Sequence, residues 1–290
     1  MSYSLGKFAD RIGNLGRPLP DPFPIYGDPT RRYKFRYGEV SMLAGKPGSF
    51  KSITALNWLA GWAGNGLGIM YFSADSGEAI VASRMTSIIT GRSAEEIDRR
   101  FSMRENLDEF SGQLDWLDRL VMFEYRQFDI DKIVKRIRGY SDIHGRSPDV
   151  IFVDNLINFV DRPDDYGDMI VLLRELDAVA REYKSHICVL HHAKFGEKKK
   201  DEDIGRAPAD HEIAGKVTQI PRIAFTSGAI GTQIQVACVK STNGPQDPFA
   251  MNPMSFRIDD SLRVIDQNRM SNVPGLNQSN LHTGTYNGQR

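Results

Sequence analysis

Short apolar runs alternate with longer amphipathic stretches along the middle of the chain. The apolar runs lie at residues 40–44, 68–73, 120–123, 150–154 and 186–190. Stretches with helical spacing follow the first four runs, at residues 52–63, 78–89, 129–140 and 166–183. Strands that are apolar along their whole length are buried on both faces, as in a parallel sheet between helices. The pattern therefore predicts an α/β fold with a mainly parallel sheet flanked by helices.

Helical spacing stops after residue 215, and the remaining apolar segments predict antiparallel strands added at one edge of the sheet. These segments are residues 217–226, 233–239 and 254–258. Residues 1–37 contain five closely spaced prolines, which exclude a long helix. We expect them to form an arm that packs on the core or on a neighbouring subunit. Residues 38–266 are the expected core, and residues 267–290, rich in Asn, Gly, Ser, Thr and Gln, an expected flexible tail.

Charge and cysteine content limit the partners and the compartment. Lys and Arg number 37, as do Asp and Glu, so the formal net charge is zero. A bulk attraction to nucleic acid is therefore excluded, and binding would need local clusters or a ring that gathers loops from several subunits.

No apolar run approaches the about 20 residues that span a bilayer, and the first six residues do not begin a secretory signal. Cys188 and Cys238 lie in apolar runs, which indicates buried free thiols and a reducing, cytoplasmic location.

The segment between the first apolar run and the first helix has the pattern of a phosphate-binding loop. It begins at Gly45 and ends in Lys51 and Ser52, close to G-x-x-x-x-G-K-[ST]. Backbone N–H groups at a helix N-terminus attract phosphate, while Lys51 would contact the β- and γ-phosphates of ATP and Ser52 would ligate Mg²⁺. The residues expected to bind nucleotide here are Gly45, Lys46, Pro47, Gly48, Ser49, Phe50, Lys51, Ser52 and Ile53. An ordinary strand–helix turn is the alternative.

Phe50 departs from this pattern, which has Gly before the lysine. That position needs a tight backbone, so Phe50 is expected to deform the loop or to weaken nucleotide binding. Gly48, two residues earlier, would supply part of the lost freedom.

Two carboxylates follow apolar runs at the sheet edge where the loop is expected. Asp154 ends the run 150–154 and is the candidate Mg²⁺ ligand. Asp75 follows the run 68–73 and is the candidate base for the attacking water, with Glu78 as the fallback. A turn or helix cap is the alternative role for each aspartate.

These features resemble the RecA/DnaB-like core of phage and plasmid replication ATPases over about residues 35–260. Phe72-Ser73-Ala74-Asp75 is similar to the family's Phe-Ser-Leu-Glu, and Asp154-Asn155-Leu156 to its Asp-Tyr-Leu. His191-His192 stands where the family has Ser-Gln, which implies that His192 senses the γ-phosphate. A polar strand end is the alternative for this pair. A zinc site is disfavoured because no third His or Cys with ligand spacing lies nearby.

Residues 239–245 resemble the family's Lys-x-Arg-Asn-Gly-Pro element, whose Lys and Arg reach the γ-phosphate of a neighbouring subunit. Lys240 matches the lysine, so the resemblance gives it that role in trans. Thr242 replaces the arginine. Since such an arginine is worth roughly 10³–10⁵ in rate, its loss favours slow hydrolysis or another arginine in its place.

Residues 193–215 follow the sensor strand and contain five cations interleaved with acids and glycines. Its cations are Lys194, Lys198, Lys199, Lys200 and Arg206. Loops at this place line the central channel in the family, so the resemblance implies contact with the backbone of single-stranded or forked DNA. A self-neutralising solvated loop is the alternative. A hexameric ring would multiply one weak contact by the number of subunits.

The resemblance implies a DNA-dependent ATPase that forms a ring, a helicase or translocase of phage-type replication or recombination. A structure-specific, Mg²⁺-dependent DNA nuclease on the same core is a second hypothesis, which predicts cleavage without ATP. A third is an ATP-switched scaffold or helicase loader with little turnover, which Phe50 and Thr242 suggest.

Overall fold

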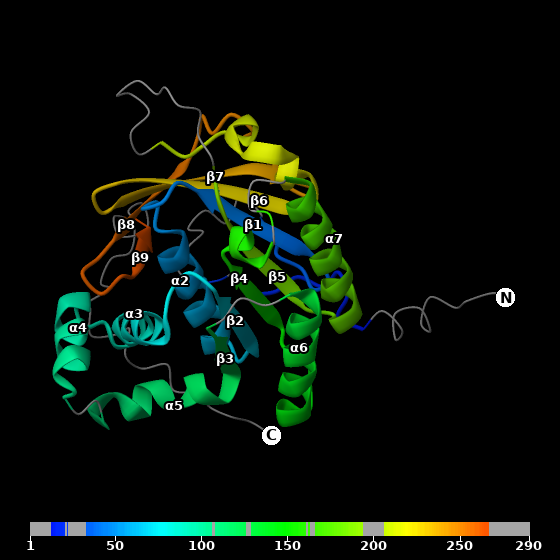
Figure 1. Cartoon of the computed structure of the whole chain (residues 1–290). Helices are drawn as coiled ribbons and strands as arrows, with labels where there is room; N and C mark the ends of the chain where they lie inside the picture. Colours follow the sequence, from blue (N-terminus) through cyan, green and yellow to red (C-terminus); the bar gives the residue numbers. More distant parts are fainter. Residues whose placement is uncertain are drawn as a thin grey trace.

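A nine-stranded sheet runs through the part of the chain that the computed structural model describes, namely residues 13–20, 22, 33–105, 108–125, 129–160, 162, 166–193 and 206–266. Its strand order is β3-β2-β4-β5-β1-β6-β7-β8-β9 (Figure 1). The strands are β1 Val40–Gly45, β2 Ile69–Ser73, β3 Val121–Glu124, β4 Val150–Asp154, β5 His186–His192, β6 Ile223–Ile230, β7 Gln233–Ser241, β8 Met254–Ile258 and β9 Val264–Asp266. Neighbours from β3 to β6 are parallel, and those from β6 to β9 are antiparallel.

Helices cover both faces of the parallel part of this sheet (Figure 1). They are α2 Lys51–Gly64, α3 Glu78–Thr90, α4 Ala94–Met103, α5 Ser111–Leu120, α6 Ile130–His144 and α7 Tyr166–Tyr183, with short 3-10 helices η2 Asp108–Phe110, η3 Leu156–Phe159, η5 Asp210–Glu212 and η6 Ala214–Gln219. Side chains of α2 and α3 share one apolar cluster with strand residues such as Leu43 and Tyr71. Side chains of α6 and α7 share the other with the alternate residues, such as Met42 and Met70. This burial on both faces confirms the predicted α/β fold.

The described residues before β1 pack on the core of their own chain. Leu19, Tyr33 and Phe35 belong to the apolar cluster beneath α2. The Phe35 ring lies 5.4 Å from Trp58 and 5.2 Å from Trp62, and Trp62 Nε1 donates to the carbonyl of Pro20 at 2.7 Å. These contacts extend the core toward the N-terminus. The expected tail, residues 267–290, lies outside the described residues.

The expectation for residues 217–226 was wrong about where the strand begins and incomplete about its pairing. Residues Ala214–Gln219 form η6, and the strand begins only at Ile223. That strand, β6, pairs in parallel with β1, from Ser41 opposite Ile223 to Gly45 opposite Ser227. The apolar Val217 is buried in the cluster with α7 rather than in the sheet. The reason is that an apolar run does not show which partner buries it. Strand β6 is parallel to β1 on one side and antiparallel to β7 on the other, so the antiparallel pairing begins at its second edge.

Helices α4 and α5 and strand β9 were not predicted, and α6 continues to His144 rather than Tyr140. Helix α4 is short and mostly polar and buries only Ile97 within its span, so no apolar run marks it in the sequence. Its start is nonetheless specified locally, because the Ser93 side chain accepts a hydrogen bond from the Glu96 N–H. Helix α6 ends at Gly145, whose φ of 69° is the left-handed conformation that favours glycine.

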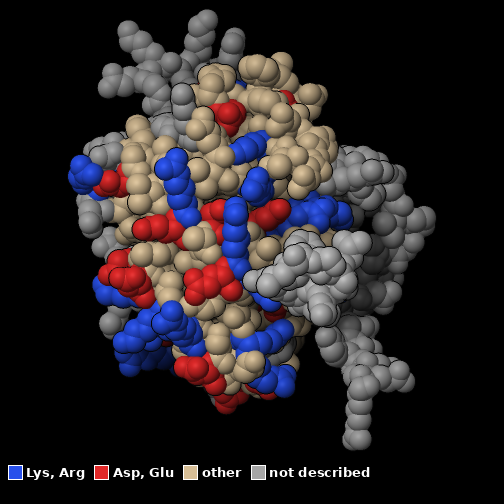
Figure 2. Space-filling view, turned by 90° about the vertical axis from the view of Figure 1, so that its right-hand side faces the viewer, with Lys and Arg blue, Asp and Glu red and all other residues tan. Residues whose placement is uncertain are grey.

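Positive and negative side chains are interspersed on the face that carries α6 and α7. Figure 2 shows this mixture over much of that face. Several of the charges are paired, for example Arg181 with Asp177 at 2.6 Å and Arg136 with Glu124 at 3.2 Å. No described helix is long and apolar enough to cross a membrane. Cys188 and Cys238 are buried free thiols, as the sequence predicted.

A buried histidine connects β5 to the segment before β1. His186 Nδ1 lies 3.0 Å from the carbonyl oxygen of Arg36, so this nitrogen is the donor, and Nε2 accepts from the Ser41 hydroxyl at 2.8 Å. Burial lowers the pKa of His186 to about 4. The ring is therefore neutral in the folded protein at pH 7.

Acid is expected to destabilise the protein through His186. Its folded pKa lies below the unfolded value, so the unfolded chain binds more protons as the pH falls from about 6.5 toward 4. Stability present above pH 6.5 is lost over that window, by about 2 kcal/mol between pH 7 and pH 5. Urea unfolding of the wild type and of His186→Gln at both pH values measures this loss. An equal loss in the two proteins would contradict it.

Candidate nucleotide-binding site

The predicted phosphate loop connects β1 to α2 at the carboxyl edge of the parallel strands. Strand β1 lies between β5 and β6, and Gly45 is opposite His192 on one side and Ser227 on the other. Helix α2 begins at Lys51, directly after the loop, and no side chain caps its N-terminus. The free N–H groups of this helix end therefore form a site for an anion.

Two glycines give the loop its shape. A Cβ at Gly45 would collide with Ser49 Oγ and with the carbonyl oxygen of Ser227. Gly48 has a φ of 80°, which L side chains rarely adopt. The Ser49 hydroxyl also lies 3.1 Å from that of Ser227, which ties the loop to β6. Neither residue of this serine pair is replaceable by a bulky one without moving the loop.

Phe50 adopts the left-handed conformation itself, with φ 59° and ψ 26°. Its ring is partly buried against the apolar cluster beneath α2. The loop thus has the backbone that the pattern's glycine would give, at a conformational cost of roughly 1–2 kcal/mol, which the ring's packing offsets.

At position 50 the conformational cost of a positive φ and the stabilisation from burying the ring act in opposite directions. Phe50→Gly removes both, so we expect its affinity for ATP to stay within about threefold of wild type. Phe50→Val is expected to weaken nucleotide binding by about tenfold, since a β-branched residue tolerates a positive φ poorly. Binding of a fluorescent ATP analogue and thermal unfolding measure both effects. Equal affinities for the two variants would contradict a backbone requirement at this position.

The Lys51 ammonium is held inside the loop. Lys51 is 5% exposed, and Nζ donates to the carbonyl oxygens of Gly45 at 3.0 Å and Lys46 at 2.8 Å. Burial lowers its pKa to about 8, while Asp154 and Asp75 act in the opposite direction. A desolvated cation of this kind gains more from a phosphate than a solvated one.

Strand alternation brings Asp154 onto the face that α2 covers. Ser73 at the end of β2 is opposite Asp154 at the end of β4. Asp154 is 2% exposed, and its carboxylate accepts from Tyr71 Oη at 2.6 Å and from the Ser52 hydroxyl. Burial raises the pKa of Asp154, and these two hydrogen bonds act against the rise. Burial and Asp154 raise the pKa of Tyr71 well above its usual value, so its hydroxyl remains a donor.

Asp75 and His192 lie together at the mouth of the site. His192 Nε2 is 3.8 Å from Asp75 Oδ2, and the Asp75 side chain is 52% exposed. Burial and Lys51 lower the pKa of His192, which the Asp75 carboxylate opposes. The fallback residue Glu78 is exposed at the start of α3. Burial and the nearby Glu78 carboxylate raise the pKa of Tyr125. Of the two acids, Asp75 is the one beside both Lys51 and His192.

Lys240 lies apart from the phosphate loop and its acidic residues. It is opposite Ala224, near the start of β6, whereas the loop adjoins Ser227, three residues further along that strand. Its Nζ donates to the carbonyl oxygens of Thr218 and Gln219, both at 2.6 Å. The Thr242 hydroxyl donates to the Arg222 carbonyl oxygen at 3.0 Å. Any contact of Lys240 with nucleotide would therefore involve another subunit.

The predicted DNA segment is described only at its end. Lys194, Lys198, Lys199 and Lys200 lie outside the described residues. Arg206 makes two hydrogen bonds of 2.9 Å to the carboxylate of Glu212. This pairing offsets the arginine's charge within the chain, which weakens Arg206 as a phosphate contact.

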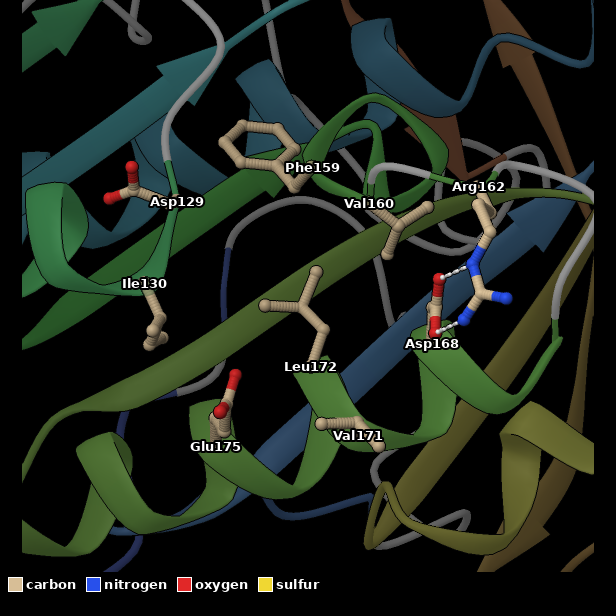
Figure 3. A pocket seen from close by; sticks show the side chains of 9 residues that line it. All are labelled: Asp129, Ile130, Phe159, Val160, Arg162, Asp168, Val171, Leu172 and Glu175. Atoms are coloured by element: carbon tan, nitrogen blue, oxygen red, sulfur yellow. Dashed lines mark hydrogen bonds and ion pairs between the residues drawn. The ribbon is translucent and has the colours of Figure 1, made fainter.

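A surface cavity of about 560 Å³ lies elsewhere, between the start of α6, the segment after β4 and the first half of α7 (Figure 3). The Arg162–Asp168 pair, with hydrogen bonds of 2.9 and 2.8 Å, borders it. It contains none of the residues that the sequence singled out as a site. The phosphate loop is instead recognised from its backbone and its charges.

Three residues of the site were missed by the sequence reasoning. Tyr71 contacts Asp154, Ser227 holds the loop, and Asn155 is 1% exposed with Nδ2 among the buried atoms lacking a hydrogen-bond partner within the described structure. Alternation along β2 could have placed Tyr71 on the face of Ser73. Ser227 carries no such signal, because its position depends on the parallel pairing of β6.

A strand, a phosphate loop, a helix and two strand-end carboxylates define this protein as a RecA/DnaB-like P-loop ATPase core. A family model described as an AAA domain, AAA_25, matches residues 33–197. The chain belongs to this family.

Two phage proteins are similar in sequence. The Gene 65 protein of Mycobacterium phage L5 is 25% identical over 266 residues, which cover 88% of this chain and 95% of that protein. The Gene 65 protein of Mycobacterium phage D29 is 26% identical over 208 residues, covering 68% and 87%.

Solved structures share the fold. One of them, a solved ATPase domain, has a TM-score of 0.69 at 14% identity, over 90% of this chain and 95% of that domain. A DnaB-like replicative helicase, described with its interactions with primase, has a TM-score of 0.65 at 14% identity, over 80% of this chain and 58% of the helicase. These likenesses confirm the fold that the sequence predicted.

Proposed function

We propose that this chain hydrolyses ATP with Mg²⁺ and couples hydrolysis to single-stranded or forked DNA. It would act as a ring-forming helicase or translocase in phage-type replication or recombination. The supporting observation is the buried Lys51 ammonium in the loop beside a Ser52 hydroxyl that donates to the Asp154 carboxylate. A lysine, a hydroxyl and a strand-end carboxylate are what a P-loop supplies to Mg·ATP.

Each residue has a distinct role in this proposal. The loop N–H groups and the start of α2 hold the phosphates, and Lys51 stabilises charge on the γ-phosphate. Asp75 accepts a proton from the water that attacks the γ-phosphorus, and His192, beside it, senses that phosphate. Ser52 and Asp154 fit Mg²⁺, which prefers few protein oxygens and keeps several waters. When bound, the metal neutralises charge on the β- and γ-phosphates.

Assembly and DNA binding complete the proposal. Lys240 lies apart from the phosphate loop, opposite Ala224 rather than Ser227 of β6, which suits a residue that serves the site of a neighbouring subunit. The lysines of residues 194–200 would contact the DNA backbone without reading sequence. A ring of about six copies would place that many such loops around one strand.

Sizing by light scattering and anisotropy of labelled oligo-dT, each with and without a non-hydrolysable ATP analogue, test this part. We expect an ATP-dependent oligomer that binds DNA in a salt-dependent manner. Replacing Lys198, Lys199 and Lys200 by Ala should weaken binding by about tenfold or more, whereas Lys132→Ala on the paired surface of α6 should not. A monomer under all conditions, or equal DNA affinity for both variants, would contradict the ring-and-channel proposal.

An ATP-switched scaffold is the second candidate, and the position of Thr242 favours it. This residue occupies the place of the family's arginine and binds the Arg222 carbonyl oxygen within its own chain. A scaffold would assemble with ATP yet be indifferent to Asp75→Asn. Assembly that requires hydrolysis would exclude this candidate.

A further inference from the structure

A tyrosine hydroxyl lies beneath the carboxylate at the end of β4. Tyr71 is two residues before Ser73 in β2, and alternation places both on the face covered by α2. Ser73 is opposite Asp154, so Tyr71 is one row deeper in the core. Tyr71 is 1% exposed, and its Oη donates to Asp154 Oδ2 at 2.6 Å.

The tyrosine ring is fixed by its neighbours. Its centroid is 5.9 Å from that of Phe123 and 5.5 Å from that of Phe152, on the two strands that flank β2. A ring packed between aromatic neighbours holds its hydroxyl in one place. The length of the hydrogen bond is that of a hydroxyl donating to a carboxylate, which is among the stronger bonds in proteins.

We propose that Tyr71 is a positioning residue that orients the Asp154 carboxylate toward Mg²⁺, a role that rests on the proposed function. The carboxyl torsion of an aspartate is intrinsically broad, so an external contact must select its orientation. Tyr71 holds Oδ2, and the Ser52 hydroxyl donates to the same carboxylate. A carboxylate has about four acceptor positions, so room remains for the metal or its water.

This arrangement separates metal binding from nucleotide binding. Tyr71 is buried behind Asp154 and does not belong to the loop that holds the phosphates. Its hydroxyl therefore acts on nucleotide only through the metal. Loss of a group that orients a metal ligand typically costs about 10–100-fold in metal affinity.

The test compares Tyr71→Phe with Tyr140→Phe in the whole protein. Tyr140 is a matched control, because it is buried and its hydroxyl donates to the Leu120 carbonyl oxygen at 3.2 Å, away from the phosphate loop. A fluorescent ATP analogue is titrated without metal and then at increasing Mg²⁺. Thermal unfolding of both variants accompanies the titrations.

Tyr71→Phe is expected to raise the Mg²⁺ concentration for half-maximal binding by about tenfold, with metal-free nucleotide affinity within about twofold of wild type. Tyr140→Phe is expected to match the wild type in both. The proposal is overturned if the two variants share one Mg²⁺ requirement, or if only Tyr71→Phe fails to fold, which would make its hydroxyl structural. A wild type without Mg²⁺-dependent nucleotide binding would instead overturn the proposed function itself.

Discussion

Lys51→Ala is expected to lower the ATP turnover of this protein by about 10²–10³-fold. The Lys51 ammonium is buried among the carbonyl oxygens of the loop, next to where the phosphates of ATP would lie. Its charge counts for more there than at a solvated site, because little water screens it. Phosphate release under saturating Mg·ATP measures the loss.

The control for this variant is Lys132→Ala, which removes an exposed lysine from the start of α6 and should leave turnover unchanged. A pH titration of the wild type adds a second measurement. Burial lowers the pKa of Lys51 to about 8, so the affinity of the wild type for nucleotide should fall as the pH rises through that value. Turnover of Lys51→Ala within about threefold of wild type would remove the lysine from the proposed chemistry.

Asp75→Asn is expected to lower turnover by about 10²–10⁴-fold while nucleotide affinity changes by no more than about threefold. An amide cannot accept the proton of the attacking water, yet it keeps the size of the carboxylate. The Asp75 side chain is about half exposed and lies beside His192. Single-turnover hydrolysis together with analogue binding separates the two effects.

The matched control for Asp75 is Glu78→Gln, three residues further along the same segment. Glu78 is exposed at the start of α3, and we expect its variant to turn over ATP within about twofold of wild type. A large loss in Glu78→Gln with normal activity in Asp75→Asn would transfer the role of base to the glutamate.

The fold was predictable where burial on both faces left a continuous apolar run. Strands β1, β2, β4 and β5 coincide with such runs to within one or two residues. Helices α4 and α5 pack against α3 outside the sheet and are short and polar on average, so they were missed although their few apolar residues lie on one face. The parallel pairing of β6 with β1 could not be predicted either, because a run that is apolar on both faces pairs equally well with a parallel or an antiparallel neighbour.

The site was predictable where the chemistry is local. The loop, Lys51 and Ser52 are consecutive, and Asp154 ends a strand that must share an edge with them. The proximity of Asp75 to His192 depends on the order of the strands, whereas the family resemblance implied only a role for each residue. The Tyr71 contact with Asp154 spans 83 positions, and only the register of β2 with β4 creates it. At Phe50 the sequence was misleading. It suggests a deformed loop, but the backbone of Phe50 adopts the left-handed conformation that a glycine would have.

We propose above that the β1–α2 loop binds and hydrolyses ATP in response to DNA. The most direct test is Mg²⁺-dependent phosphate release by the wild type, with and without single-stranded DNA. We expect turnover that DNA stimulates and that disappears without Mg²⁺. Nucleotide binding with no turnover under any condition would contradict it and leave an ATP-switched scaffold as the function to examine.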